Sequence, residues 1–258
     1  MTQALEVRRL RKVYEGHGRT VEAIGDLSFA CAPGELACIV GPSGAGKTTL
    51  LKCVAGLLAP TTGEVVLGDA RVVGPPPGMA VVFQDYGRSL FPWLTVWRNV
   101  ALPIAHRGPR DELRRLVDDA LAEVGLADVH AAYPWQLSGG MQQRVGIVRA
   151  LLHDPAILLM DEPFAALDAM TREAMSVELQ RIWMQRRITA LFITHSITEA
   201  VFLADRVIVL TPRPGTIGDQ FEVDLPRPRA LEVMNTERFG RCVQRVRAAL
   251  GGRGAVVE

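Results

Sequence analysis

Residues 35–57, ELACIVGPSGAGKTTLLKCVAGL, constrain the fold more than any other part of the sequence. An apolar strand-like run leads into a glycine-rich turn, and a helical pattern follows. The turn carries the phosphate-loop pattern Gly41-x-x-x-x-Gly46-Lys47-Thr48 in its required strand-to-helix context. Glycines let successive backbone N–H groups wrap a β-phosphate, while the lysine neutralises phosphate charge and the threonine hydroxyl binds Mg²⁺. The segment predicts a nucleotide-binding α/β domain, and a glycine-rich turn without a ligand is the weaker interpretation.

Length and composition limit the classes of protein to which the chain can belong. The chain has 258 residues, which suits one large domain or one domain with an inserted lobe, and 48% of them are hydrophobic, enough for a substantial core. A net charge of +1, from 29 basic and 28 acidic residues, gives no support for nucleic-acid binding. No apolar run approaches the roughly 18–20 residues that span a bilayer, and the N-terminal stretch has no signal-peptide core.

The cysteines indicate the redox environment. Cys38 and Cys53 flank the phosphate loop inside apolar segments, and together with Cys31 and Cys242 they show no metal-ligand spacing. Apolar surroundings are usual for reduced core thiols. We therefore expect reduced cysteines and a cytoplasmic location.

Hydrophobic patterning predicts strands at both ends of the chain. Short β-like runs separated by turns occupy the first third, at 21–29, 36–40 and 64–67. From Pro155 onward the pattern is strand, helix, strand, with continuous apolar runs typical of parallel strands that are buried on both faces: AILLMDEP, TALFITH and RVIVL.

The middle of the chain has helical spacing instead. Residues 111–124 form one predicted helix, which Gly125 ends, and residues 139–152 form another. We therefore expect an α/β core with a helical lobe inserted at about 88–154. Residues 226–230, PRPRA, are predicted to link this domain, residues 1–225, to a last helix within 226–258.

An acidic pair ends one of the predicted strands. Asp161 and Glu162 follow the apolar run ILLM, and ligands of α/β sheets bind at the carboxyl ends of strands. Asp161 suits Mg²⁺ binding through water, and Glu162 suits a general base or a water-orienting group at the γ-phosphate. The competing interpretation is an N-cap for the helix that follows Asp168.

A second anion-binding turn lies nearly a hundred residues after the phosphate loop. The segment LSGGMQQR, residues 137–144, opens onto a helix with Ser138, Gly139 and Gly140. Free N–H groups at a helix N-terminus bind phosphate, and small residues allow close approach. One nucleotide does not need both turns, so the second one requires an explanation.

Three further residues are ambiguous on their own. His195 follows the strand-like run TALFIT, Gln84 follows MAVVF, and Tyr14 lies in an N-terminal strand region. A lone histidine is more often structural than functional, and single glutamine and tyrosine residues carry less information still.

Together these motifs resemble the ATP-binding cassette of ABC transporters, over residues 5 to about 220. The most specific elements are LSGGMQQR and the following ILLMDEP, because a phosphate loop alone fits many nucleotide enzymes. The resemblance implies an α/β fold. It would have a P-loop NTPase (RecA-like) core, an N-terminal antiparallel β subdomain and an inserted ABC helical subdomain.

The resemblance also gives the residues roles. Tyr14 matches the aromatic residue that stacks on adenine, Gln84 the glutamine that senses Mg²⁺ and the attacking water, and His195 the switch histidine at the γ-phosphate. Asp168 in AALD matches the D-loop at the dimer seam, with Glu162 as the catalytic carboxylate. Thr48, Gln84 and Asp161 would hold Mg²⁺, and ATP would bind to Tyr14 and to the loop residues Gly41, Pro42, Ser43, Gly44, Ala45, Gly46, Lys47, Thr48 and Thr49.

In this family two cassettes meet head to tail, which explains the second turn. Each ATP would lie between the phosphate loop of one chain and the signature residues of its partner: Ser138, Gly139, Gly140 and Gln142. The hydrolysis of ATP removes that bridge, so the nucleotide state controls dimer closure.

Three longer stretches indicate a subgroup. FQDYGRSLFPWLTVWRNVALP, DEPFAALDAMTRE and ADRVIVLTPRPGTI resemble the nitrate, sulfonate and taurine importers. The expected partners are a second copy of the chain, two transmembrane permease subunits and, indirectly, a substrate-binding receptor. The expected location is the cytoplasmic face of the inner (plasma) membrane, peripherally bound. Phe91 and Trp93 either belong to a local core or receive a permease helix.

Other ATPases remain as alternatives. A soluble ABC ATPase of DNA repair or chromosome maintenance would need a long coiled-coil insertion with sustained heptads, and a translation factor of this family normally holds two cassettes in one chain. Neither feature is present in the sequence. A small-molecule kinase with a phosphate loop does not account for the Ser-Gly-Gly turn. An ATPase that is not coupled to transport is the second interpretation.

Overall fold

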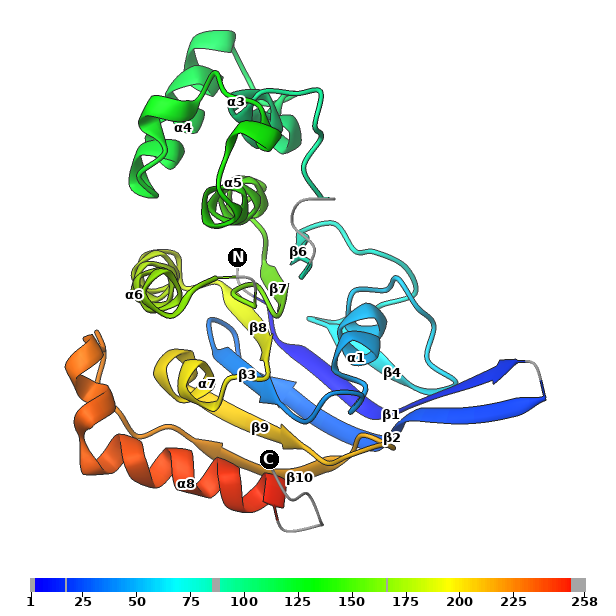
Figure 1. The fold of residues 1–258 in the computed structure, drawn as a ribbon. Coiled ribbons are helices and arrows are strands. Elements are labelled where there is room, and N and C mark those ends of the chain that lie inside the picture. Colours follow the sequence, from blue (N-terminus) through cyan, green and yellow to red (C-terminus); the bar gives the residue numbers. More distant parts are fainter. Residues whose placement is uncertain (1–2, 17, 85–88, 166, 252–258) are drawn as a thin grey trace.

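The computed structural model describes residues 3–16, 18–84, 89–165 and 167–251, and its core is a six-stranded sheet (Figure 1). The strand order is β10-β9-β3-β8-β7-β6, with β10 antiparallel to its neighbour and the others parallel. The bounds are β3 (Leu36–Val40), β6 (Met79–Val82), β7 (Ile157–Asp161), β8 (Thr189–Thr194), β9 (Arg206–Leu210) and β10 (Ile217–Glu222).

Every residue of β3, β7 and β8 is buried, because elements cover both faces of this sheet. The apolar runs therefore predicted the central strands correctly, and the predicted bounds of β3 at 36–40 are confirmed.

A second, antiparallel sheet comes from the first third of the chain. Its order is β2-β1-β4-β5, formed by β1 (Leu5–Gly16), β2 (Arg19–Cys31), β4 (Thr62–Leu67) and β5 (Ala70–Arg71). Helix α1 (Lys47–Val54) packs in the core between the two sheets, where Leu50 and Leu51 are fully buried. Burial of these leucines against both sheets fixes the direction of the phosphate loop that precedes them. The α/β fold with its antiparallel subdomain is as expected.

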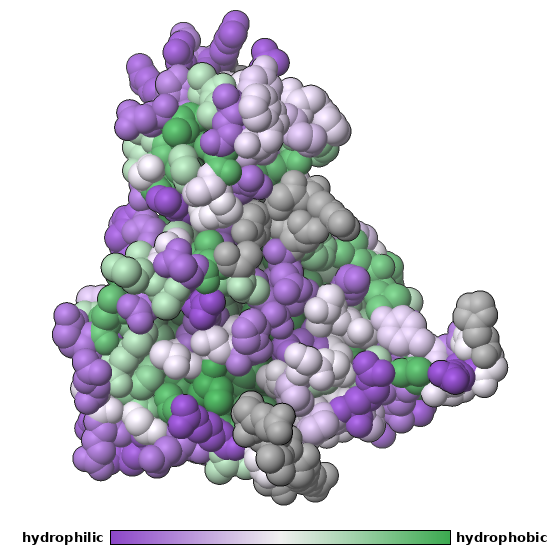
Figure 2. Space-filling view, viewed as in Figure 1, coloured by the Kyte–Doolittle hydropathy of each residue, from purple (hydrophilic) through white to green (hydrophobic). Residues whose placement is uncertain are grey.

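Helices α3 (Val96–Ala101), α4 (Arg110–Glu123) and α5 (Gly139–Leu152) lie between β6 and β7 and rise from the core as a separate lobe (Figure 1). Short 3-10 helices connect them: Leu102–Ile104, Ala127–Val129 and Pro134–Gln136. The helix predicted at 139–152 has those bounds, and α4 stops one residue before the predicted end, with Val124 as its C-cap and Gly125 at φ 68°. Hydrophilic side chains cover the outer end of the lobe (Figure 2).

The side chain of Asn99 fixes the backbone at the start of this lobe. This side chain is fully buried, and its Oδ1 accepts a hydrogen bond from the Phe91 backbone N at 2.8 Å. Its Nδ2 donates to the carbonyl oxygens of Phe91, Leu94 and Thr95 at 3.1, 3.1 and 3.2 Å. One buried amide thus sets the backbone path of residues 91–95.

The remaining helices, α6 (Ala169–Arg186) and α7 (Ile197–Leu203), cover the face of the central sheet opposite α1, and α8 (Glu237–Gly251) runs beside β10 (Figure 1). Arg229 anchors the predicted linker at 226–230, because its side chain is 2% exposed, while Pro226, Pro228 and Ala230 are exposed. Its Nη1 donates to the carbonyls of Val201, Phe202 and Ala204 at 3.0, 2.8 and 2.8 Å, which caps the C-terminal end of α7. Burial lowers the pKa of Arg229 to about 10.

The cysteines lie as expected of core thiols. Cys31, Cys38 and Cys53 are buried and free, and Cys242 is half-buried. Burial raises the pKa of the Cys31 thiol to about 12 and that of Cys53 to about 11, so both are protonated and unreactive at neutral pH.

Candidate nucleotide site

The phosphate loop closes one end of a pocket of about 400 Å³ at the carboxyl edge of the central sheet. Backbone conformation explains the glycines. Gly46 has φ 84°, and a Cβ there would lie 2.5 Å from the Ala23 carbonyl oxygen, so only glycine fits. Gly44 is also left-handed, at φ 79°. The described residues that line the pocket are Tyr14, Val21, Ala23, Ser43, Gly44, Gly46, Lys47, Thr48, Thr49, Gln84, Glu162 and Arg213.

Lys47 is held inside this loop. Its side chain is 6% exposed, and its Nζ donates to the carbonyl oxygens of Gly41 and Pro42 at 2.9 and 3.2 Å. Gly41 and Ala45 are buried behind the pocket and complete the loop. A cation bound only by neutral carbonyls and one carboxylate remains a strong site for phosphate oxygens.

Tyr14 also lines the pocket. It is 43% exposed, and its hydroxyl lies 3.4 Å from the Thr49 Oγ1. The ammonium group of Lys12 lies 5.4 Å from the centre of the tyrosine ring. An aromatic ring that lines a pocket beside a phosphate loop can stack on a nucleotide base.

The acidic pair occupies the place that the sequence predicts. Asp161 ends β7 and is 2% exposed, and its Oδ1 has no hydrogen-bond partner within the described part of the chain. Burial is the main cause that raises the pKa of Asp161, while a hydrogen bond from the Thr48 side chain opposes that rise. A buried, incompletely satisfied carboxylate beside a threonine hydroxyl is a suitable environment for a cation.

The Glu162 side chain contacts both the phosphate loop and the residue that follows β8. Its Oε1 lies 3.7 Å from the Lys47 Nζ, and its Oε2 lies 2.9 Å from the His195 Nδ1. The His195 side chain is 55% exposed, directly after β8. Glu162 has φ 45°, a left-handed conformation that costs a non-glycine residue about 1 kcal/mol or more. Such strain is concentrated at functional sites, which argues against a mere helix cap.

The helix that follows the acidic pair, α6, is capped by a different carboxylate. Asp168 is the N-cap of α6, and its carboxylate accepts hydrogen bonds from the Thr171 backbone N at 3.0 Å and the Thr171 Oγ1 at 2.6 Å. These bonds lower the pKa of Asp168. Neither Asp168 nor His195 is among the described residues that line the pocket.

The second anion-binding turn does not line this pocket. Ser138 is the N-cap of α5, where its Oγ accepts from the Met141 N at 3.3 Å, and the Gln142 Nε2 donates to the Leu137 carbonyl at 3.2 Å. Helix α5 starts at Gly139. A Cβ at Gly140 would lie 3.3 Å from side-chain atoms of Leu167 and Thr171, so this turn adjoins the start of α6. Ser138, Gly139, Gly140 and Gln142 do not appear among the described pocket-lining residues.

No sequence motif assigned a role to Arg213, which the structure brings into the pocket from the β9–β10 turn. The order of the strands could have indicated this position. Strand β9 pairs in parallel with β3, so the residues after β9 emerge at the same sheet edge as the phosphate loop after β3.

The fold and the pocket define the class: a phosphate-loop ATPase with an inserted helical lobe. Residues 24–165 match the sequence profile of the family described as ABC transporter. The chain belongs to the ABC transporter family, as the resemblance implied, and it is an ABC-type ATPase.

Similar sequences and solved structures support this family assignment. The nitrate import ATP-binding protein of Synechocystis sp. is 42% identical over 258 residues, 96% of each chain. The taurine import ATP-binding protein of Chromobacterium violaceum is 48% identical over 83% of this chain and 81% of its own. A dimeric ATP-binding cassette in a post-hydrolysis state, bound to ADP and Pi, has a TM-score of 0.76 at 30% identity, covering 86% of this chain and all of that one. A cassette of Clostridium perfringens from the ABC transporter complex CbiONQ has a TM-score of 0.77 at 26% identity, covering 95% of both chains.

Proposed function

We propose that this ATPase energises the import of a small anion, such as nitrate, a sulfonate or taurine, as one of two identical cassettes beneath a membrane permease. The printed names of the relatives support the solute class. The observation that carries the mechanism is the separation of the two phosphate-binding turns: Lys47 lines the pocket and Ser138 does not. An ATPase that is not coupled to transport would not account for the importer relatives.

In the proposed site, Thr48, Asp161 and Gln84 would hold Mg²⁺, Asp161 through water. The unpartnered Oδ1 of Asp161 fits this role. Mg²⁺ keeps several waters and binds substrate phosphates, so it needs few protein ligands; the described residues contain no cluster of three or more His, Cys, Asp or Glu that could hold a metal. Bound Mg²⁺ would neutralise phosphate charge. Glu162 accepts the proton of the attacking water, and His195, held by Glu162 at 2.9 Å, faces the γ-phosphate.

The composite site predicts a cross-link that forms between chains only when ATP is bound. Ser43 and Ser138 are both exposed, so cysteines placed there are accessible. Cys242 is changed to Ser first, and the three buried cysteines remain. Chains with Ser43→Cys are mixed with chains with Ser138→Cys, with a short bifunctional thiol reagent because a direct disulfide requires Cα atoms within about 7 Å. We expect a species of twice the monomer mass with MgATP, and much less without nucleotide.

Ser28→Cys is the matched control for this experiment, since Ser28 is also exposed but belongs to the antiparallel sheet. It replaces Ser138→Cys and should give no ATP-dependent product with Ser43→Cys. A dimer yield that ignores ATP, or equals that of the control, would refute the composite site.

Two exposed aromatic residues support the proposed permease contact. Trp93 is 68% and Phe91 is 36% exposed, and their ring centres lie 5.4 Å apart. A side chain this exposed contributes little to a core, which supports the interface interpretation of Trp93. The hydrogen bonds of Asn99 hold the backbone beneath them. Rigidly held aromatics are favoured anchors at protein interfaces.

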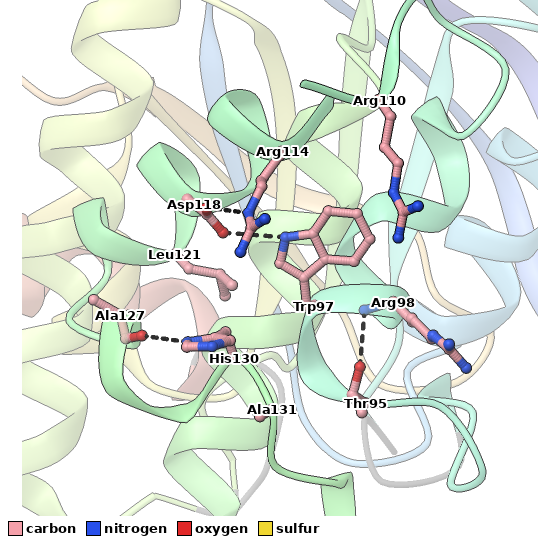
Figure 3. Close-up of a pocket in the computed structure, with 10 residues that line it drawn as sticks. All are labelled: Thr95, Trp97, Arg98, Arg110, Arg114, Asp118, Leu121, Ala127, His130 and Ala131. Carbon is pink, nitrogen blue, oxygen red and sulfur yellow. Dashed lines mark hydrogen bonds and ion pairs between the residues drawn. The ribbon is translucent and has the colours of Figure 1, made fainter. Parts of the chain in front are cut away.

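The neighbouring face of the lobe is hollowed. A pocket of about 580 Å³ lies between α3 and α4, where Trp97 donates its Nε1 to the Asp118 Oδ1 at 3.1 Å (Figure 3). The guanidinium groups of Arg98 and Arg110 line this pocket without a hydrogen bond or ion pair to any described residue (Figure 3). A cytoplasmic permease segment with an acidic side chain would suit this surface.

Removal of these aromatics should weaken assembly. Phe91→Ala and Trp93→Ala should each reduce the amount of cassette that co-purifies with the co-expressed permease about tenfold, as expected for interface anchors worth 1–2 kcal/mol. Leu57→Ala is the control, because Leu57 is an exposed apolar residue outside the helical lobe, shortly after α1. Thermal unfolding of the isolated Trp93→Ala cassette should change little, because the Trp93 side chain is 68% exposed. An equal loss of stability and assembly would contradict docking at this surface.

The location of the cassette depends on its proposed assembly with the permease. None of the helices formed by the described residues combines the length and the hydrophobicity that a membrane span requires. We infer that permease contacts hold the cassette at the cytoplasmic face of the inner (plasma) membrane, and that a separate receptor supplies the solute.

A further inference from the structure

The turn between β9 and β10 brings a second cation to the nucleotide pocket. Residues 211–216, TPRPGT, connect these strands, and Arg213 at the centre of the turn lines the pocket with Lys47 and Ser43. The Arg213 Nε donates to the Gly44 carbonyl oxygen at 3.3 Å. A Cβ at Gly44 would lie 3.5 Å from the Arg213 Nη2, so the guanidinium group covers the middle of the phosphate loop.

Backbone contacts lock this turn to the core behind the loop. The Gly25 N donates to the Gly215 carbonyl at 3.0 Å, and the Gly215 N donates to the Ala23 carbonyl at 3.2 Å. A Cβ at Gly215 would lie 2.0 Å from the Ala45 carbonyl oxygen, so the turn packs directly against the phosphate loop. This packing gives Arg213 a defined position at the pocket, unlike an arginine on a free surface loop.

The electrostatic surroundings leave Arg213 available to an anion. It and Lys47 are the cations among the described pocket-lining residues. Lys47 lies 3.7 Å from a carboxylate oxygen of Glu162, whereas no carboxylate of a described residue forms an ion pair with Arg213. A guanidinium group presents planar N–H donors that match phosphate oxygens in pairs.

We propose that Arg213 binds the phosphate chain of the nucleotide and supplements Lys47 from the edge of the sheet. The proposal rests on the ATP site described above. It makes Arg213 a binding residue, with the triphosphate and not the base as its target.

The test is equilibrium binding of Mg-ATP and Mg-GTP to the isolated full chain at two salt concentrations. Arg213→Gln should weaken the binding of both nucleotides about five- to tenfold, since both carry the same triphosphate. Arg213→Lys should recover part of the loss, because the charge remains. The loss should shrink at high salt, because Arg213 is exposed and its charge is screened. Arg115→Gln removes an exposed charge from α4 in the lobe and should change neither affinity.

The other outcomes separate the two proposals. Unchanged binding in Arg213→Gln, or a loss for ATP alone, would overturn the phosphate assignment, the latter in favour of a base contact. A loss without any salt dependence or lysine rescue, accompanied by a lower thermal stability of the nucleotide-free chain, would show that Arg213 only supports the loop. If the unaltered chain binds neither nucleotide, or if Lys47→Ala leaves binding intact, the nucleotide site itself is wrong.

Discussion

Replacing Glu162 with Gln should lower ATP turnover about 10²-fold or more while ATP binding remains. The amide has nearly the same shape as the carboxylate but cannot accept a proton from water. Glu162 contacts both Lys47 and His195, at 3.7 and 2.9 Å, so its carboxylate lies where the phosphate loop and the end of β8 meet. ATP that binds but is not hydrolysed should accumulate a closed dimer.

The measurement is steady-state phosphate release with the permease in detergent, together with nucleotide affinity and the dimer fraction of the isolated cassette. Glu173→Gln is the matched control, because Glu173 is an exposed carboxylate on α6. It should keep normal turnover. Near-normal turnover in Glu162→Gln would show that another group accepts the proton.

Local sequence signals predicted most elements because each had its own physical cause. The bounds of β3 followed from an unbroken apolar run between a turn and the glycine-rich loop, and those of α5 from helical spacing after Ser138. A glycine marked the end of α4 within one residue. The phosphate loop needed no tertiary information, since strand, turn and helix are contiguous in the chain.

The parts that were missed depend on contacts between distant residues. Arg229 is buried against α7 carbonyls some 25 residues earlier, for example that of Ala204, and PRPRA has the composition of a linker. Arg213 reaches Gly44 across 169 positions. The 2.9 Å contact between Glu162 and His195 likewise arises because β7 and β8 are paired in parallel. Composition and periodicity do not contain these pairings.

Lys47→Ala should weaken nucleotide binding itself, whereas Glu162→Gln should lower turnover and leave binding intact. Hydrogen bonds to a charged group contribute about 1.5–3 kcal/mol, so removal of this ammonium group should lower ATP affinity about ten- to hundredfold. Lys47 is 6% exposed, and water compensates poorly for a buried cation. Titration with a fluorescent ATP analogue, followed by displacement with ATP, measures the change.

Lys52→Ala provides the matched control, since Lys52 belongs to the same helix, α1, but is exposed. It should change affinity little. Removal of Lys47 also takes the nearest cation from Glu162, so urea unfolding of the nucleotide-free chain must accompany the titration. Lost affinity with retained stability would assign Lys47 to the phosphates. Unchanged affinity would contradict the phosphate-loop assignment, on which the roles of Glu162 and Arg213 also depend.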